Sequence, residues 1–438
     1  MTTQGQGDAF RHSAAIAFLL APLGTAIAPK LTTVFLPLLV VVLISAAMWH
    51  SPRWWKAISQ SAAVTACLAL SLYAFLNATW SWNPTSALAK VAILLGLVLA
   101  ILLVRSAVGA LTEPQSRAFS IAFIVGAGLA IVYLLIEVST DNAITRGAYN
   151  TFPAIRPDNT KRIEVADNIV TRVNLNTLNQ GVAIAMFNLW PALLMLTATP
   201  DRRRKWAIGA LFFIATAVVV FASEHSSSQM ALLGSAIVFA LAYMWRRVVL
   251  RMLSVLWCLA FLLVLPASFL AHDAGLHAHP SLPYSFRARV VLWDYTAERT
   301  LDHPWLGIGV SSTREMGVAS RKVLTPAQKE GFRIRKEAGD VTIYRTTGHH
   351  THSLYLQTWF ELGAVGAALF ALAGALVILR AETLPRDLHP YAAAAFATFA
   401  LIAAFAWGMW QTWWMCAVGL LAIYLCLGFQ RGESRAQL

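Results

Sequence analysis

The sequence predicts an all-α polytopic membrane protein, and three observations support this fold class. Of its 438 residues, 58% are hydrophobic and only 13% are charged, whereas a soluble protein of this length carries roughly a quarter charged residues. The mean hydropathy is +0.61. Apolar runs of about twenty residues, the length needed to cross a bilayer as a helix, recur through the chain. This composition excludes a soluble globular domain.

We expect about twelve transmembrane helices, packed as a single transmembrane domain over residues 1–438. The first span follows Arg11 and has features of a cleavable signal peptide, but Pro22 and Gly24 interrupt its apolar core, so we expect it to stay uncleaved. No internal repeat is evident in the sequence. The predicted spans are 13–29, 31–49, 58–77, 86–105, 117–138, 178–197, 205–222, 229–245, 251–270, 352–379, 390–407 and 410–428.

The distribution of basic residues predicts the orientation of these spans. With the N-terminus on the inner side, the inner connections hold sixteen Lys and Arg residues, whereas the short outer connections hold only Lys30. Cytoplasmic connections are typically enriched in Lys and Arg in this way. We therefore expect both termini in the cytoplasm. A smaller loop (139–177) and a large loop (271–351) then lie outside, where long loops are exempt from the charge rule.

The formal net charge of +13 would suggest nucleic-acid binding in a soluble protein. Here the positive charge follows the predicted topology and does not gather on a soluble domain, so we exclude nucleic acid as a partner. Contact with anionic lipid headgroups is the ordinary explanation of such charge. The four cysteines all lie inside apolar runs, so we expect neither a disulfide nor a thiol metal site; they are Cys67, Cys258, Cys416 and Cys426.

The large loop interrupts the apolar pattern with eleven Lys and Arg residues and eight Asp and Glu residues. A basic loop beside many spans suggests a site for an anionic, membrane-anchored substrate. In its first third stand Arg287, Arg289 and Trp293. A helix would put Arg289 and Trp293 on one face, whereas a strand would put the two arginines on one side. Guanidinium groups bind phosphate oxygens bidentately, although anchoring to lipid headgroups is the alternative.

A second group of polar residues stands where the large loop enters the tenth span. It contains Arg345, His349, His350, His352 and Gln357. Histidine suits proton transfer near neutral pH, so His352 is a candidate general base, with a purely structural role as the alternative. A metal site is not expected, because neither an HExxH motif nor a pair of cysteines accompanies these histidines.

Other polar residues fall on the same outer side. Glu224 and His225 stand in the short connection after the seventh span, where an ionisable pair at a membrane face indicates function and helix capping is the alternative. Arg172 lies in the smaller loop. The segment Asp302–Gly309 is expected to be a turn that brings the large loop back to the bundle, because Pro304 ends a helix and its glycines permit tight turns.

These motifs resemble those of the O-antigen ligase and O-antigen polymerase superfamily, and the resemblance covers most of the chain. Their order and spacing together make the match specific. The motifs are Arg289-x-x-x-Trp293, His303-Pro304-x-Leu306-Gly307-Ile308-Gly309, His352-Ser353-Leu354-Tyr355-Leu356-Gln357 and Glu361-Leu362-Gly363.

The resemblance implies a metal-independent, inverting glycosyltransferase with a GT-C-like fold, no cofactor and a periplasmic active site in the bacterial inner membrane. Its donor would be a glycan on undecaprenyl diphosphate and its acceptor lipid A–core, with membrane lipids around it. The histidine motif is more typical of a ligase; an O-antigen polymerase or a protein O-oligosaccharyltransferase is the alternative. Many members carry an Arg after the seventh span, where this chain has Glu224 to Gln229.

On this basis we assign Arg287 and Arg289 to the lipid diphosphate and His352 to the acceptor hydroxyl, with Glu224 as an alternative base. Further substrate-binding residues are expected among Arg172, Arg345, His349, His350, His225, Trp293 and Gln357. A transporter would bury ionisable residues at mid-span, but here they concentrate at span ends and loops. A non-catalytic scaffold for glycan assembly is the other class of function that the sequence leaves open.

Overall fold

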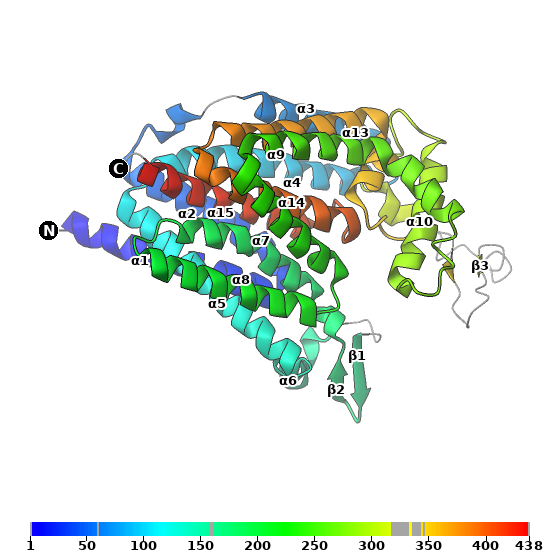
Figure 1. Cartoon of the computed structure of the whole chain (residues 1–438), viewed down its shortest axis with the longest axis horizontal. Helices are drawn as coiled ribbons and strands as arrows, with labels where there is room; N and C mark the ends of the chain where they lie inside the picture. Colours follow the sequence, from blue (N-terminus) through cyan, green and yellow to red (C-terminus); the bar gives the residue numbers. More distant parts are fainter. Residues whose placement is uncertain are drawn as a thin grey trace.

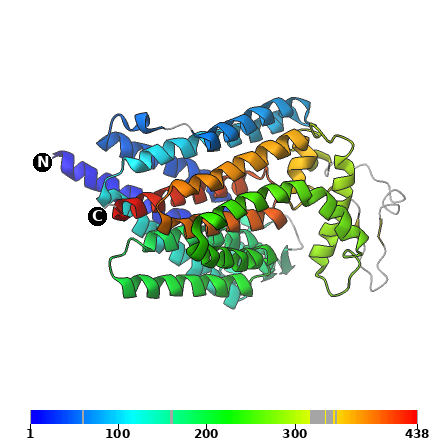
Figure 2. The same ribbon diagram turned by 45° about the horizontal axis from the view of Figure 1, so that its top comes forward.

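The computed structural model describes residues 2–58, 61–157, 162–316, 333–334, 343–344 and 347–436. Its helices run side by side in one bundle, with both termini at one end (Figures 1 and 2). The helices and strands of the two long loops lie at the opposite end. We call these the terminal end and the loop end. This arrangement agrees with the prediction that both termini share one side and both long loops share the other.

Eleven helices among the described residues are long and apolar enough to cross a membrane, so the chain is an all-α polytopic membrane protein. They are α1 (Thr2–Ile27), α2 (Thr32–His50), α3 (Ala62–Asn77), α4 (Pro84–Gly109), α5 (Glu113–Ser139), α7 (Asn179–Leu196), α8 (Arg202–Ala222), α9 (Ser226–Asp273), α13 (Leu354–Arg380), α14 (His389–Phe405) and α15 (Thr412–Ala436).

The difference between eleven helices and twelve predicted spans lies in α9. This 48-residue element contains non-helical backbone at Trp245 and Arg246, so it is two helices joined at a sharp bend. Arg246 pairs with Asp387 at 3.3 Å, in the connection between α13 and α14. Because that connection lies at the terminal end, the bend does too. The two limbs of α9 therefore correspond to the predicted spans 229–245 and 251–270.

Helix α7 lies at the centre of the bundle, and 83% of the most apolar 18-residue window of its span is buried. Its Trp190 donates a hydrogen bond from Nε1 to Thr398 Oγ1 of α14 at 3.0 Å, which satisfies the indole inside an apolar interior. The second limb of α9 packs through Trp257 against Tyr355 of α13 and Phe396 of α14. These contacts fix α13 and α14, the two helices that flank the site described below.

Both long loops contain regular structure at the loop end (Figure 1). The smaller loop forms α6 (Ala143–Thr151) and an antiparallel hairpin of β1 (Ile163–Ala166) and β2 (Ile169–Val173). The large loop forms α10 (Tyr284–Thr300) and pairs β3 (Arg333–Ile334) with β4 (Ile343–Tyr344). Short 3-10 turns connect other elements: η1 (Pro29–Leu31), η2 (Trp54–Ala57), η3 (Ala78–Trp80), η4 (Pro153–Ile155), η6 (Leu175–Leu178), η7 (Ala381–Thr383) and η8 (Arg386–Leu388).

The glycines of the large loop allow it to touch the backbone of α13. Helix α13 breaks at Gly363 (φ +65°), and the loop donates from Gly309 N to Glu361 O at 3.0 Å across this break. Gly307 has φ +67°, and a Cβ there would lie 2.4 Å from the Glu361 carbonyl carbon. Only glycine fits such an approach. The segment 302–309 is therefore the expected turn that brings the loop back to the bundle.

Candidate active site

The site is built first on α10, which carries Arg289 and Trp293 one turn apart. The segment is a helix, so these two residues share a face and the strand alternative is wrong. Trp293 donates from Nε1 to the carbonyl oxygen of Thr351 at 2.9 Å. Its ring also meets the edge of Phe286, with centroids 6.0 Å apart. Trp293 thus fastens α10 to the residue that precedes His352.

His352 is held in a constrained conformation just before α13. Its backbone is left-handed (φ +54°), which is uncommon for a residue with a side chain and recurs at functional sites. Its ring nitrogen Nδ1 lies 2.7 Å from the carbonyl oxygen of Ala406. The next residue, Ser353, caps the first turn of α13 by accepting from Leu356 N. His352 is therefore fixed from α10, α13 and the connection between α14 and α15.

Arg289 lies among three histidines that come from two distant parts of the chain. Burial lowers the pKa of His225 to about 4, of His350 to about 3 and of His352 to about 4. Burial is the largest cause of these lowered pKa values, and the positive charge of Arg289 is a smaller contribution to each of them. Burial also lowers the pKa of Arg289 itself. The rings of His350 and His352 are 4.1 Å apart. We call Arg289, His225, His350 and His352 the arginine–histidine cluster.

The low pKa of His352 decides its protonation state. At neutral pH its imidazole is neutral and carries one proton. A carbonyl oxygen only accepts hydrogen bonds, so the Ala406 contact requires that proton on Nδ1. The lone pair of Nε2 is then left to accept a proton or a hydrogen bond from a hydroxyl group. This is the state that a general base needs.

His225 occupies the short connection between α8 and α9. Its Nδ1 lies 2.6 Å from Ser228 Oγ, and its ring stacks on Trp407 with centroids 4.9 Å apart. Trp407 belongs to the connection between α14 and α15, which also carries Ala406. One connection therefore supports His225 and His352 together.

Two further cations border the cluster. Arg314 follows the glycine turn and is exposed, and its charge contributes to the lowered pKa of His350. Lys90, near the start of α4, donates from Nζ to Thr412 Oγ1 at 2.9 Å and is close enough to Arg314 for their charges to interact. Sequence reasoning missed both residues as site members, since each is a lone cation in its own segment. Only the folded chain brings Arg314 near His350 and Lys90 near Arg314.

The buried side chain of Glu361 connects the segments that carry the cluster. Glu361 is fully buried and accepts hydrogen bonds from Ser311 N at 2.9 Å and Thr313 N at 3.1 Å. It also accepts from Gln357 Nε2 at 3.1 Å and from Trp410 Nε1. Four donors from three segments thus converge on one side chain. Glu361 joins the glycine turn and the α14–α15 connection to α13, and so sets where Arg314 and the histidines lie.

Comparison with known proteins agrees with this architecture. A family model described as O-antigen ligase matches residues 210–371, which contain Arg289, His350, His352 and Glu361. This match and the relative described next support a likeness to the O-antigen ligase superfamily. A Rickettsia conorii protein named "Putative polysaccharide ligase" is 20% identical over 307 residues, which cover 67% of this chain and 63% of that protein. The chain thus spans less than two thirds of the length of this relative.

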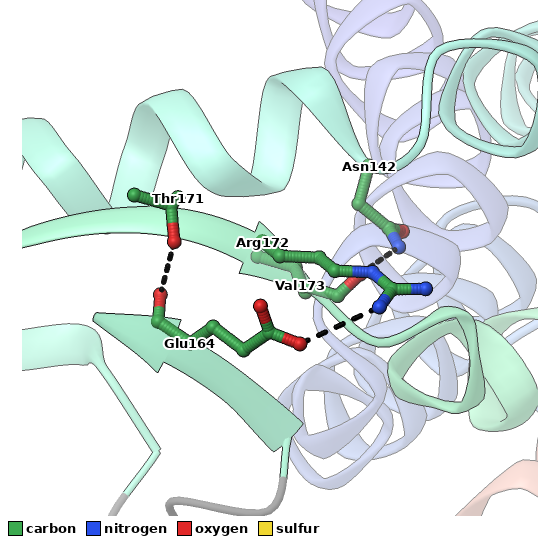
Figure 3. Close-up of polar contacts among 5 residues, drawn as sticks. All are labelled: Asn142, Glu164, Thr171, Arg172 and Val173. Atoms are coloured by element: carbon green, nitrogen blue, oxygen red, sulfur yellow. Dashed lines mark hydrogen bonds and ion pairs between the residues drawn. The ribbon is translucent and has the colours of Figure 1, made fainter. Parts of the chain in front are cut away.

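Some residues predicted for the site lie apart from the cluster. Glu224 is exposed, although the adjacent His225 is buried. Arg172 stands on β2 and pairs with Glu164 at 3.4 Å, with both side chains about two thirds exposed, at 65% and 68% (Figure 3). The hairpin itself is tied to the end of α5 by Asn142, which donates to Val173 O at 2.9 Å (Figure 3). No described contact joins Arg172 to the cluster.

The other predicted residues occupy different positions in the structure. Arg287 is half-buried on α10, and two residues along a helix turn it by about 200° from Arg289, so the two arginines do not share a face. Gln357 is bound at both ends of its amide, to Glu361 and to Met409 N, which supports the α14–α15 connection. His349 is half-buried beside His350, and Arg345 lies outside the described residues.

Within the described part of the chain, no group of three or more His, Cys, Asp and Glu side chains is arranged to hold a metal ion. The charges of Arg289 and Arg314 act on His350, and Lys90 lies near Arg314. This composition repels a metal cation and attracts an anion.

Proposed function

We propose that this chain is a glycosyltransferase that moves an O-antigen glycan from undecaprenyl diphosphate to lipid A–core, by a metal-independent, inverting reaction on the periplasmic face of the inner membrane. The observation that carries the proposal is the position of Arg289 among His225, His350 and His352 at the loop end. The family match and the polytopic fold support the same class of substrate, a glycan on a membrane lipid.

On the donor side, breaking a sugar–diphosphate bond places negative charge on the leaving diphosphate. Fixed cations stabilise such charge most effectively where water is excluded. Arg289 is mostly buried, and its guanidinium keeps its charge despite the lowered pKa. In our proposal Arg289 holds the diphosphate, and Arg314 and Lys90 neutralise the charge that develops on it.

On the acceptor side, a sugar hydroxyl must be aligned for in-line attack and must lose its proton. We assign His352 Nε2 to this task, because the Ala406 contact keeps the proton on Nδ1. The proton moves from the hydroxyl to Nε2 while the new glycosidic bond forms and the bond to the diphosphate breaks. Attack from the face opposite the leaving group inverts the anomeric centre.

The test uses purified protein in detergent, mixed with undecaprenyl-diphosphate-linked glycan and lipid A–core in the presence of EDTA. We expect a glycan-bearing lipid A–core product for the wild type and none for Arg289→Gln. Activity that disappears in EDTA and returns with Mg²⁺ would contradict the metal-independent mechanism. Size-exclusion profiles of both proteins control for loss of folding.

The same assay separates the alternative functions. Lengthening of the donor glycan with lipid A–core unchanged would assign the chain as an O-antigen polymerase, and transfer to a protein acceptor as a protein O-oligosaccharyltransferase. A scaffold or transporter predicts no transfer to any of these acceptors. The clustering of ionisable residues at the loop end and not at mid-span favours an enzyme over a transporter.

A further inference from the structure

A cavity of about 530 Å³ opens at the terminal end, on the opposite side of the bundle from the arginine–histidine cluster. It lies between η2 and the last turns of α4. Because Ser81, just before α4, lies against Ser312 of the large loop with their Oγ atoms 3.1 Å apart, α4 starts at the loop end and its final residues mark the terminal end. The lining residues are Ser51, Arg53, Trp54, Lys56, Ala57, Ile58, Leu102, Arg105, Ser106, Gly109 and Ala110.

The cavity is strongly basic. Three of its lining residues are cations and none is acidic: Arg53 and Lys56 come from η2 and its N-cap, and Arg105 from α4. No ion pair within the described residues involves any of the three. Other arginines at the terminal end do pair with acids, as Arg246 with Asp387 and Arg251 with Glu382. The cavity thus gathers cations that have no acidic partner among the described residues, although Lys56 also lies over the Trp55 ring.

The cavity also has a fixed frame. Trp54 is buried, and its carbonyl oxygen accepts a hydrogen bond from Ser106 Oγ at 2.7 Å, which joins η2 to α4. Arg53 and Arg105 are therefore held on two elements that are bonded to each other. The positive-inside rule explains why Lys and Arg residues are enriched at this end of the bundle. It does not explain why three of them line one cavity on two elements that are hydrogen-bonded to each other.

We propose that this cavity binds the phosphate of an anionic phospholipid headgroup in the cytoplasmic leaflet. Phosphate oxygens are the ligands that Arg and Lys side chains recognise, and basic pockets at the cytoplasmic ends of transmembrane helices bind such headgroups. The apolar side chains of Ile58 and Leu102 on the same wall suit a ligand with acyl chains. A soluble phosphate compound shares the charge but gains nothing from these apolar groups.

The test counts the lipids retained by the full chain in mild detergent, using native mass spectrometry with added phosphatidylglycerol or phosphatidylcholine. We expect the wild type to retain phosphatidylglycerol at least about tenfold better than phosphatidylcholine. The variant R53Q/K56Q/R105Q should lose this preference. The matched control R202Q/R203Q/R204Q removes three exposed cations at the start of α8, none of which lines the cavity, and should keep it.

Equal loss of preference in both variants would overturn the proposal in favour of general surface attraction. A wild type without headgroup preference would also overturn it. Competition with glycerol 3-phosphate separates the two sources of phosphate. Binding of glycerol 3-phosphate without retention of phosphatidylglycerol would assign the cavity to a soluble ligand and reject the lipid. If the triple variant does not fold, Arg105→Gln alone should reduce retention several-fold.

Discussion

The Nδ1–H group of His352 donates a hydrogen bond to the carbonyl oxygen of Ala406, 2.7 Å away and 54 residues further along the chain. This contact turns an ordinary histidine into one with a defined tautomer and a free Nε2 lone pair. It also makes the catalytic proposal depend on the connection between α14 and α15. That connection lies outside residues 210–371, which match the O-antigen ligase family model.

The α14–α15 connection (406–411) supports the site at nearly every residue. Gly408 packs on His350, and Met409 N donates to Gln357 Oε1 at 3.1 Å. Its other contacts link Trp407 to His225 and Trp410 to Glu361. The contacts of this connection therefore hold the histidines in place.

The first prediction tests the role of Nε2 in His352. In His352→Asn, the side-chain amide can donate to Ala406 O in place of Nδ1, but no group replaces Nε2. We expect transfer to fall by about 10²- to 10⁴-fold, the usual contribution of a general base, with little change in stability. The measurement is the rate of product formation together with the unfolding temperature in detergent. Near-normal transfer by His352→Asn would remove Nε2 from the mechanism.

The alternative base provides a matched comparison. Glu224 is exposed, so we expect Glu224→Gln to keep transfer within a few-fold of the wild type. The same assay measures both variants. If Glu224→Gln loses as much activity as His352→Asn, the roles of the two residues must be reassigned.

Much of the fold could be predicted from the sequence because its causes are local. Apolar runs of span length located both limbs of α9, which meet at the bend at Trp245 and Arg246. The turn at Gly307 could also be predicted, because glycine and proline determine the backbone conformation of the segment in which they stand. Arg289 and Trp293 could be placed on one face once α10 was assumed to be a helix.

The site could be predicted only in part, because its members meet through packing between distant segments. No spacing indicates that Arg314 and Lys90 lie near each other, or that Ala406 accepts from His352. The sequence pattern also suggested that Gln357 binds substrate. In the structure, the Nε2 and Oε1 atoms of its amide are hydrogen-bonded to Glu361 and Met409. Hydrogen bonds of this kind depend on side-chain positions that a pattern of residue types does not contain.

A second prediction concerns the fit between Gly408 and His350. A Cβ at position 408 would lie 2.7 Å from His350 Cβ, so Gly408→Ala must displace the histidine. We expect at least a tenfold loss of transfer and a destabilisation of about 1–3 kcal/mol, as for other overpacked sites. The control is Gly96→Ala, where an added Cβ meets nothing within 4 Å. Equal activity of both variants would show that the position of His350 is unimportant.

A third prediction concerns Glu361, which receives four hydrogen bonds and makes none as a donor. In Glu361→Gln one oxygen becomes an NH₂ group that faces N–H donors, so buried donors lose their acceptor. We expect a destabilisation of about 1–3 kcal/mol and a loss of transfer. Glu382→Gln is the control, because its ion pair with Arg251 is partly exposed and contributes at most about 1 kcal/mol. An equal unfolding temperature for both variants would contradict the supporting role of Glu361.

The last prediction concerns stability at acid pH. Burial and Arg289 lower the pKa of His225 to about 4, from 6.5 in an unfolded chain. Between these values the unfolded state binds the proton and the folded state does not, so stability is complete above pH 6.5 and falls as the pH drops to about 4. A shift of this size corresponds to at most about 3 kcal/mol. The unfolding temperature in detergent should follow this course.

Two variants isolate the contribution of His225 to that course. The amide of His225→Gln does not titrate, so its unfolding temperature should fall less steeply between pH 6.5 and 4 than that of the wild type. His279→Gln changes an exposed histidine outside the cluster and should leave the wild-type slope unchanged. If His225→Gln retains the full wild-type slope, the acid sensitivity arises elsewhere, and the burial of His225 beside Arg289 is not what keeps it neutral.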